Sequence, residues 1–366
     1  MKILVTGANG FIGKNLCLKL SELGYNDVIK IDRTNSDSEL KRALENADFI
    51  FHLAGINRPQ TEEEFYIGNS GLTEKITTTL ESLGRSTPIL LTSSIQADRD
   101  NAYGLSKASA ERAISAYQQK LNADVYIYRL PNVFGKWCQP NYNSMVATFC
   151  YNVANDLPIT INDNNVVVNL VYIDDVCEQF CLHLTQANVD AVVEPIYHKT
   201  VGEVAELLNK FKQSKNTLIT ENVGAGFTRA LYSTYLSYFS PNQFTYTVPA
   251  YTDPRGTFCE MLKTPEAGQF SYFTAHPGIT RGGHYHHTKN EKFLVIKGTA
   301  KFRFEEVLTG QKEEFVVTAE QHKIVETVPG WSHDVTNIGD DELIVMLWAN
   351  EIFDREKPDT FAKEIK

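Results

Sequence analysis

The 366-residue sequence predicts two fold classes in one chain: an α/β doubly wound parallel sheet, followed by an all-β barrel or jelly roll. From Met1 to about Leu130, short β-branched runs alternate with longer helix-like stretches. From Thr247 onward, closely spaced short strands are separated by Gly, Pro, Asn and Asp. A hydrophobic content of 42% is enough to form a core in each part.

Five apolar runs predict the strands of the first domain, and a helix through NLCLKLSEL follows the first of them. The runs are KILVTGA, DVIKID, ADFIFHLAG, PILLTSS and VYIYRL. Strands that return at this interval with helical crossovers form a parallel sheet covered on both faces. Residues 132–246 are less regular, with helix-like stretches SMVATFCYNVAND and VGEVAELLNKFKQS, and are expected to cap the sheet where such folds bind ligands. The first domain is therefore predicted over residues 1–246.

Residues 247–366 are predicted to form the second domain. Its strands are expected at FLVIKG, AKFRFEEV, EEFVVTA, HKIVETV and ELIVMLWAN. Short strands at this spacing are typical of antiparallel barrels and jelly rolls.

Composition excludes several classes of partner. With 45 acidic and 35 basic side chains the formal charge is −10, so we expect no nucleic-acid partner. The sequence runs from Met1 directly into an apolar strand without a signal-peptide pattern, and no apolar run reaches membrane-spanning length, so no membrane insertion is expected. The six cysteines have no C-x-x-C spacing, which favours a reduced, cytoplasmic protein.

The segment TGANGFIG, after the first predicted strand, indicates a dinucleotide site. Gly7, Gly10 and Gly13 would provide the tight turn, the close approach to a pyrophosphate and the packing of helix on strand. Asp32 ends the second strand and suits the ribose hydroxyls of NADH, whereas Arg33 suits the 2′-phosphate of NADPH. The residues leave this choice open.

The segment YGLSK places Tyr103 and Lys107 on one face of a predicted helix. Lys107 is expected to depress the pKa of Tyr103 from about 10, so that the phenol exchanges a proton near neutrality. The run TSS, which ends at Ser94, closes the strand before this helix and offers a hydroxyl to a substrate carbonyl.

These motifs, together with HLAG, RLPNVFG and VYIDDV, resemble the extended short-chain dehydrogenase/reductase family that acts on nucleotide sugars. The resemblance implies that Ser94 binds the carbonyl, Tyr103 is the general acid, Lys107 supports it and anchors the nicotinamide ribose, and Asn132 lies near the substrate. Because only eight residues separate Ser94 from Tyr103, Ser93 stays an alternative. The predicted cofactor contacts are Gly7, Gly10, Phe11, Ile12, Gly13, Asp32, Arg33, Leu53, Ala54 and Lys107.

A second group of motifs lies in the predicted barrel: His284, His286 and Glu291 precede Gly298, and His333 follows a Pro-Gly turn. This pattern resembles both halves of the cupin signature. Alternate residues on a strand point to one face, and His333 is expected to arrive from the opposite sheet. Three imidazoles and a carboxylate suit Zn²⁺, with Fe²⁺ or Mn²⁺ as alternatives. His287 stays an alternative to His284.

The flanking segments YTDPRGTFCE and PGITRGGHYHH resemble cupins that epimerise or isomerise nucleotide-linked 4-keto sugars. In that group a histidine base removes the proton next to the ketone. Arg255 and Arg281 suit pairing with a substrate diphosphate.

From end to end, the sequence is similar to bifunctional enzymes of UDP-N-acetyl-L-fucosamine biosynthesis in capsule and O-antigen pathways, notably at FGKWCQPNYNSMVATFCYN, LYSTYLSY and HHTKNEKFLV. The resemblance implies a UDP-2-acetamido-2,6-dideoxy-4-keto-hexose substrate, epimerisation at carbon 3 in the barrel, and NADPH-dependent reduction at carbon 4 to the L-talose-configured product. Two alternatives stay open: a single-function reductase whose barrel is a metal-stabilised dimerisation or sensing module, and a 3,4-ketoisomerase. A homodimer is expected by default.

Overall fold

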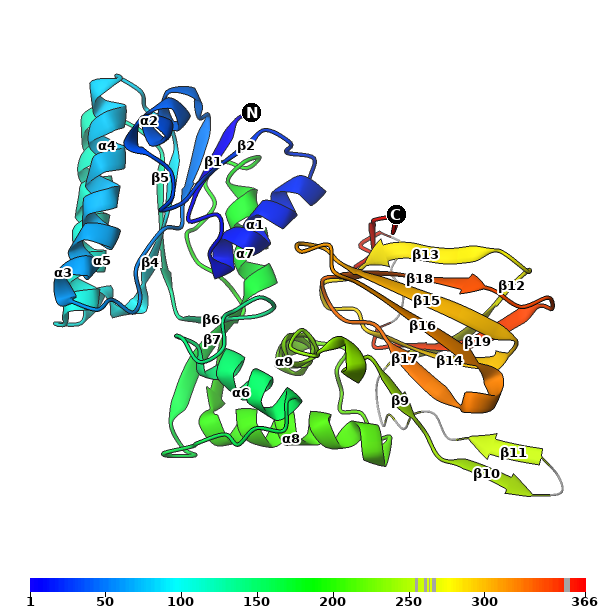
Figure 1. The fold of residues 1–366 in the computed structure, drawn as a ribbon. Coiled ribbons are helices and arrows are strands. Elements are labelled where there is room, and N and C mark those ends of the chain that lie inside the picture. Colours follow the sequence, from blue (N-terminus) through cyan, green and yellow to red (C-terminus); the bar gives the residue numbers. More distant parts are fainter. Residues whose placement is uncertain (254–255, 260–261, 263, 265–267, 352–355) are drawn as a thin grey trace. The chain divides into compact units, whose positions relative to one another are not determined.

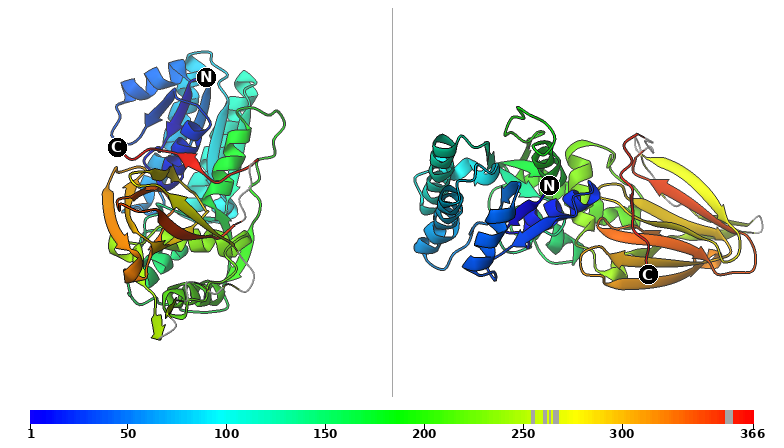
Figure 2. Two further views of the ribbon diagram at one scale, coloured as in Figure 1. Left: turned by 90° about the vertical axis from the view of Figure 1, so that its right-hand side faces the viewer. Right: turned by 90° about the horizontal axis from the view of Figure 1, so that it is seen from above.

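The computed structural model describes residues 1–253, 256–259, 262, 264, 268–351 and 356–366, with the backbone alone for 250–253, 256–259, 269 and 271. They form two compact units, which Figures 1 and 2 show as ribbons. The first unit is Met1–Ser144 with Val168–Lys199, and the second is Met145–Val167 with Thr200–Lys366. The functional boundary near residue 247 stays a prediction.

The centre of the first unit is a parallel sheet of five strands in the order β2-β1-β3-β4-β5. Every residue of β1, β3 and β4 is buried, as expected for strands covered on both faces. The sheet confirms the five predicted strands. They are β1 (Ile3–Thr6), β2 (Val28–Ile31), β3 (Phe49–His52), β4 (Ile89–Ser94) and β5 (Val125–Leu130).

Helices lie on both faces of this sheet and confirm the doubly wound fold (Figure 1). On one face are α1 (Phe11–Glu22) and α7 (Ile173–Leu182); on the other are α2 (Asp37–Asn46), α4 (Leu72–Ser82) and α5 (Ala102–Leu121). Leu4, Ile76 and Ile114 belong to the core between the sheet and the second group of helices. The strand order reverses between β1 and β3, and the carboxyl ends of the strands at such a point are where doubly wound sheets bind ligands.

Short elements complete the first unit. The connection from β3 to α4 contains α3 (Glu62–Phe65) and the π-helical turn η1 (Tyr66–Gly71), and η2 (Ile95–Asp98) joins β4 to α5. A small sheet that the sequence pattern did not predict has the order β6-β7-β8. Its strands are β6 (Asn132–Phe134), β7 (Val167–Tyr172) and β8 (Tyr197–Thr200).

In the second unit, three helices precede the barrel strands in sequence. They are α6 (Met145–Ala154), α8 (Val201–Thr217) and α9 (Gly226–Leu236), and the 3₁₀ turn η3 (Pro241–Gln243) follows them. A capping box in which Thr200 and Glu203 bond each other's backbone amides fixes the start of α8. The first two helices correspond to the helix-like stretches expected between 132 and 246.

The remaining strands form two five-stranded antiparallel sheets, in the orders β12-β19-β14-β17-β9 and β16-β15-β18-β13-β20, and a β10-β11 hairpin. Buried aromatic side chains fill the core, with the rings of Phe293 and Phe302 5.6 Å apart. The predicted all-β class is thus confirmed. The strands are β9 (Thr245–Thr247), β10 (Ala250–Asp253), β11 (Gly256–Cys259), β12 (Gln269–Ala275), β13 (Thr280–Tyr285), β14 (Glu291–Lys297), β15 (Thr299–Glu306), β16 (Lys312–Thr318), β17 (Lys323–Glu326), β18 (Trp331–Asn337), β19 (Leu343–Ala349) and β20 (Phe361–Ala362), and the turn η4 (Ala319–Gln321) precedes β17.

A buried charge pair joins α9 to the strands β14 and β17. The ammonium of Lys292 lies 2.5 Å from Glu326 Oε1, and both side chains are at most 2% exposed. The hydroxyl of Tyr232 on α9 donates to the same carboxylate oxygen at 3.0 Å, and Lys292 donates to the hydroxyl of Tyr246 at 3.0 Å. Helix α9 is therefore tied to the barrel by a buried polar network.

None of the helices in the described part of the chain has both the length and the apolar character needed to cross a membrane.

Candidate active sites

The glycine turn after β1 has almost no room for side chains. Gly7 has φ +68°, and a Cβ there would lie 2.8 Å from the backbone of Ala54. A Cβ at Gly13 would lie 2.2 Å from the carbonyl oxygen of Gly7. The carbonyl of Gly7 also accepts from the amide of Gly10 at 2.9 Å. The turn therefore needs glycine at both positions and leaves a cradle of backbone atoms at the start of α1.

This cradle fits a dinucleotide pyrophosphate. Helix α1 begins at Phe11 after Gly10, and no side chain caps its first amides. Such amides attract anions, because they lack intrahelical partners and lie at the positive end of the helix dipole. Leu53 and Ala54 follow β3, and their amides donate to the carbonyl and the hydroxyl of Thr6. The predicted contact residues that follow β1 and β3 thus meet where the strand order reverses.

Asp32 and Arg33 follow β2. The carboxylate of Asp32 accepts from the amide and the hydroxyl of Thr34, at 2.8 and 2.6 Å, and from the amide side chain of Asn9. The hydrogen bonds with Thr34 are the main reason that the pKa of Asp32 lies below its ordinary value. The side chain of Arg33 is exposed. Both oxygens of Asp32 are therefore already engaged, whereas the guanidinium beside it faces solvent.

The two serines at the end of β4 have different partners. The hydroxyl of Ser93 donates to Glu111 on α5 at 2.5 Å, and Glu111 also binds Arg129 in a bidentate pair. Ser94 instead forms a hydrogen bond with Tyr103 and accepts from the amide of Gln96 at 3.2 Å. Of the two serines, Ser94 is the one beside the tyrosine.

Tyr103 and Lys107 lie in the first turns of α5, with the Lys107 ammonium 6.0 Å from the centre of the Tyr103 ring. Lys107 is 6% exposed and donates to the carbonyl of Thr92 at 3.1 Å. The expectation that Lys107 depresses the pKa of Tyr103 is wrong. Burial raises the pKa of Tyr103 although the hydrogen bond with Ser94 opposes this, and burial lowers the pKa of Lys107 to about 8.

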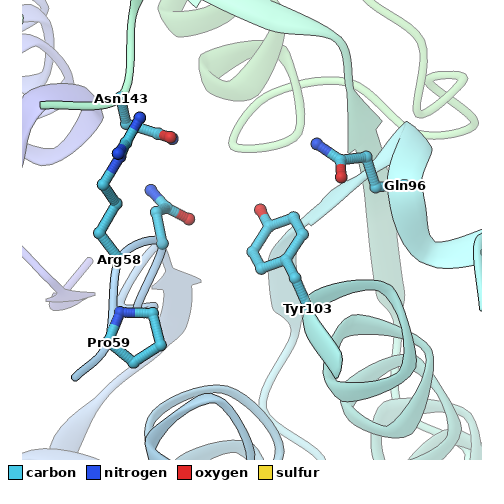
Figure 3. A pocket seen from close by; sticks show the side chains of 6 residues that line it. Arg58, Pro59, Gln96, Tyr103 and Asn143 are labelled. Carbon is cyan, nitrogen blue, oxygen red and sulfur yellow. The ribbon is translucent and has the colours of Figure 1, made fainter. Parts of the chain in front are cut away.

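Tyr103 opens into a cavity of about 420 Å³ in the first unit. Figure 3 shows Tyr103 and Gln96 on one side of the space and Arg58 and Asn143 on the other. Sequence reasoning missed the other wall residues. The position of Arg58, in the loop after β3 at the carboxyl edge of the sheet, was the available signal. The cavity is lined by Asn57, Arg58, Pro59, Gln96, Tyr103 and Asn143.

Asn132 lies outside the set of residues that line this cavity. It is the first residue of β6, is exposed, and donates from its amide side chain to the carbonyl of Asn169 at 3.2 Å. The prediction that Asn132 lies near the substrate is therefore not supported by a contact with this cavity.

In the barrel, four predicted ligands come together. One ligand atom from each of His284, His286, Glu291 and His333 lies within 4.8 Å of the other three. Glu291 Oε2 is 3.3 Å from His286 Nε2 and 3.2 Å from His333 Nε2. Three imidazoles and a carboxylate at this spacing are a donor set that fits Zn²⁺ or a similar divalent cation.

The protonation states also suit a cation. Burial, helped by His333 and His286, lowers the pKa of His284 to about 3, and burial lowers the pKa of His333. Burial raises the pKa of Glu291, but the imidazoles of His286 and His333 beside its carboxylate outweigh this effect and hold that pKa well below its ordinary value. Neutral imidazoles and an ionised carboxylate are the forms that bind a metal.

The origin of these side chains differs in one respect from the expectation. His333 on β18 lies directly across from His284 on β13, in the same sheet. Glu291, at the start of β14, comes from the other sheet. A register shift at Gly282, where φ is +103°, brings His284 opposite His333. The expectation that His333 arrives from the opposite sheet is therefore wrong.

The neighbouring His287 lies outside the four-residue cluster. Its ring packs 4.9 Å from that of Phe361 and 5.7 Å from that of Tyr285. Of the two alternatives, His284 is the histidine that shares the cluster.

The two arginines expected at a diphosphate are placed as follows. Arg281 on β13 is exposed, donates to the carbonyl of Thr274 at 3.2 Å, and lies over the ring of Phe273 at 5.3 Å. Arg255 lies outside the described residues.

Comparisons with known proteins agree with this architecture. The model of the NAD dependent epimerase/dehydratase family matches residues 3–196, which include the glycine turn and the Tyr103 helix. The chain belongs to that family. A second family model, the polysaccharide biosynthesis C-terminal domain, matches residues 251–361 of the chain.

Relatives of this family member extend over its full length. It is 56% identical, over 365 residues, to UDP-2-acetamido-2,6-beta-L-arabino-hexul-4-ose reductase from Pseudomonas aeruginosa, covering 99% of this chain and 98% of the relative. The crystal structure of capsular polysaccharide assembling protein CapF from Staphylococcus aureus is 40% identical, covers 100% of both chains and has a TM-score of 0.68. UDP-glucose 4-epimerase from Thermotoga maritima is 21% identical, covers 58% of this chain and 82% of its own, and with a TM-score of 0.52 supports the fold alone.

Proposed function

We propose that the chain is a bifunctional enzyme of UDP-linked 2-acetamido-2,6-dideoxy-4-keto-hexoses, with epimerisation at carbon 3 in the barrel and NADPH-dependent reduction of the carbon 4 ketone in the first unit. The observation that carries the proposal is the Tyr103 site with its cavity, in a chain 56% identical along its length to a UDP-sugar 4-ulose reductase. The product would be UDP-2-acetamido-2,6-dideoxy-L-talose, for capsule or O-antigen synthesis.

In the reduction, Ser94 would hold the ketone oxygen and Tyr103 would protonate it. A raised pKa keeps the phenol of Tyr103 protonated at neutral pH, which is the state that a proton donor needs. The charged ammonium of Lys107, 6.0 Å from the ring, would stabilise the phenolate left after transfer and bind the nicotinamide ribose. The nicotinamide cofactor, when bound, supplies the hydride to carbon 4.

The residues proposed to hold this cofactor are the glycine cradle, Leu53 and Ala54, the pair Asp32 and Arg33, and Lys107. The engagement of both Asp32 oxygens by Thr34 and Asn9 supports NADPH over NADH, because the carboxylate is then less available to ribose hydroxyls. The exposed guanidinium of Arg33 would pair with the 2′-phosphate.

In the barrel, His284, His286, Glu291 and His333 are proposed to hold a divalent metal, with zinc preferred by the donor set. When bound, such a metal would supply Lewis-acid stabilisation of the enediolate oxygen that forms as a histidine base takes the carbon 3 proton, and return of a proton to the opposite face of carbon 3 would complete the epimerisation. Arg281 and Arg255 stay the proposed partners of the diphosphate, and Asn132 stays a proposed substrate residue. The homodimer and the cytoplasmic location stay predictions from the sequence.

The test is NMR of the products formed from the 4-keto sugar nucleotide in D₂O, with and without NADPH. We expect deuterium at carbon 3 without cofactor, and the talose-configured product with it. Absence of exchange would reduce the barrel to a structural or sensing module, and a carbonyl moved to carbon 3 would identify a ketoisomerase.

Replacing Tyr103 by Phe separates the two steps. Turnover in reduction should fall at least ~100-fold, the usual effect of losing a general acid, while deuterium exchange at carbon 3 and cofactor affinity persist. Tyr25→Phe, outside the cavity, is the control. Reduction by Tyr103→Phe at more than about a tenth of the wild-type rate would remove Tyr103 from the mechanism.

A further inference from the structure

The loop of residues 286–290 joins two of the proposed metal ligands, and Asp359 in the C-terminal segment holds it. Asp359 Oδ1 accepts from the amide of His287 at 2.9 Å. Oδ2 accepts from the amides of Thr288 and Lys289, each at 2.6 Å, and from the hydroxyl of Thr288 at 2.9 Å. One carboxylate therefore fixes three consecutive backbone amides of the loop.

The backbone of Asp359 also contacts a ligand. Its carbonyl oxygen bonds His286 Nδ1, and because a carbonyl only accepts, Nδ1 must carry the proton. In the neutral ring, His286 Nε2 is then the nitrogen that can bind a cation, and it lies 3.3 Å from Glu291 Oε2. The contact with Asp359 thus selects both the tautomer and the orientation of the ring.

Helix α9 holds the same loop from another side. Arg229 donates to the hydroxyl of Thr288, lies 3.2 Å from Glu351 and 3.9 Å from Asp359. One turn later, Ser233 donates to the carbonyl of Thr288 at 3.2 Å. The Thr288 hydroxyl accepts from Arg229 and donates to Asp359, so it bridges the helix and the C-terminal segment.

The fixed loop also orients the second ligand. Lys289, whose amide is bound by Asp359, places its ammonium 2.8 Å from Glu291 Oε1. This ion pair occupies Oε1 and leaves Oε2 between the histidine nitrogens of His286 and His333. The atoms that face the centre of the cluster are therefore determined by how the loop is held.

We propose that Asp359 and Arg229 are positioning residues of the barrel site, which present His286 Nε2 and Glu291 Oε2 to a divalent cation. This inference rests on the proposed metal site. It assigns the last residues of the chain and one face of α9 to the function of that site, although neither contributes a ligand in the described cluster.

The test compares Zn²⁺ affinity and the visible absorption spectrum of Co²⁺ in full-length wild type and Asp359→Asn. Asparagine keeps the size of the side chain but loses the second acceptor and the charge, so we expect metal affinity to fall about 10- to 100-fold and the Co²⁺ bands to shift. Asp340→Asn, at an exposed carboxylate of the same unit, is the matched control and should change neither.

Two further variants keep the outcome decisive. Thermal melting reports whether Asp359→Asn folds. Thr288→Val removes only the bridging hydroxyl and should shift the Co²⁺ spectrum in the same direction, so it provides the test if Asp359→Asn does not fold. His333→Ala tests the site itself: metal binding equal to that of wild type would overturn the proposed metal site and this inference with it. Loss of binding in His333→Ala, together with wild-type affinity and spectrum in Asp359→Asn and Thr288→Val, would overturn the positioning role alone.

Discussion

Burial shifts the pKa values of Tyr103 and Lys107 in opposite directions. The phenol holds its proton more strongly, and the ammonium holds its proton less strongly, with a pKa of about 8. At neutral pH both groups are still protonated, which is the combination that the reduction of a ketone needs. The limit on the alkaline side is therefore expected from the lysine rather than from the tyrosine.

The pH dependence of reduction should show this limit. As pH rises through about 8, Lys107 loses its charge and kcat/KM for reduction should fall, whereas the raised pKa of Tyr103 keeps the acid protonated. Initial rates against pH measure this. In Lys107→Arg the cation persists, so the alkaline fall should move to higher pH. A wild-type profile that stays flat to about pH 10 would contradict the assignment.

Cofactor choice is also decided by single residues. Arg33→Ala should weaken NADPH by roughly 1.5 to 3 kcal/mol more than NADH, the amount typical of one charge-assisted contact. Titration of both cofactors into wild type and variant measures the difference, with Arg42→Ala, an exposed arginine on α2, as control. Equal losses for the two cofactors would mean that Arg33 reads no 2′-phosphate.

Residues within short motifs were predicted more completely than residues that meet only in the fold. The spacing of His284, His286 and Glu291 reflects strand geometry, and the cluster contains all three. Arg58 and Asn143 belong to distant loops, and only the fold brings them to one cavity. The pKa of Tyr103 was mispredicted because sequence shows its neighbours on the helix but not the loss of solvent.

At the scale of elements, the sequence pattern did not predict that α9 binds the barrel. The stretch was expected to cap the parallel sheet, but one helical stripe, Arg229, Tyr232 and Ser233, bonds groups of the barrel. No periodicity of apolar residues predicts this, because the contacts are polar and their partners lie far along the chain.

The buried pair beneath α9 should be costly to break. Lys292→Met leaves the carboxylate of Glu326 buried without its ion-pair partner and should lower the free energy of unfolding of the second unit by about 3 to 5 kcal/mol. Denaturant unfolding followed by barrel tryptophan fluorescence measures this. Adding Glu326→Gln should recover part of the loss, and Lys301→Met, which breaks an exposed pair with Glu314, should cost under ~1 kcal/mol. A loss no larger than this control would contradict a stabilising network.

At the scale of the whole molecule, the two proposed chemistries draw on separate sets of residues. His286→Ala and Glu291→Ala should lose metal and carbon 3 exchange, while the reduction of a substrate that already has the inverted configuration persists. Metal content, thermal melting and exchange on the same variant measure this. A stable, metal-free barrel with wild-type exchange would leave only a metal-independent base.

The fold classes followed from the sequence because each has its own period. Alternating strand and helix patterns predicted β1 to β5 and the helices between them, and dense short strands predicted the barrel. The three-stranded sheet of β6, β7 and β8 was not predicted, because its six-residue central strand β7 pairs with strands of only three and four residues that lie far from it in the chain. Local pattern carries little information about such pairings.

The division of the chain into two interleaved units has a consequence for its synthesis. Helix α6 emerges from the ribosome roughly 50 residues before α8 and roughly 70 residues before α9, its packing partners, which at about 5 to 20 residues per second is an interval of seconds. During that time β7 and α7 can complete the first unit, while apolar residues such as Phe149, Cys150 and Val153 still lack their neighbours. Until α8 and α9 are synthesised, the nascent protein thus exposes the apolar side chains of α6, which a chaperone at the exit tunnel would bind.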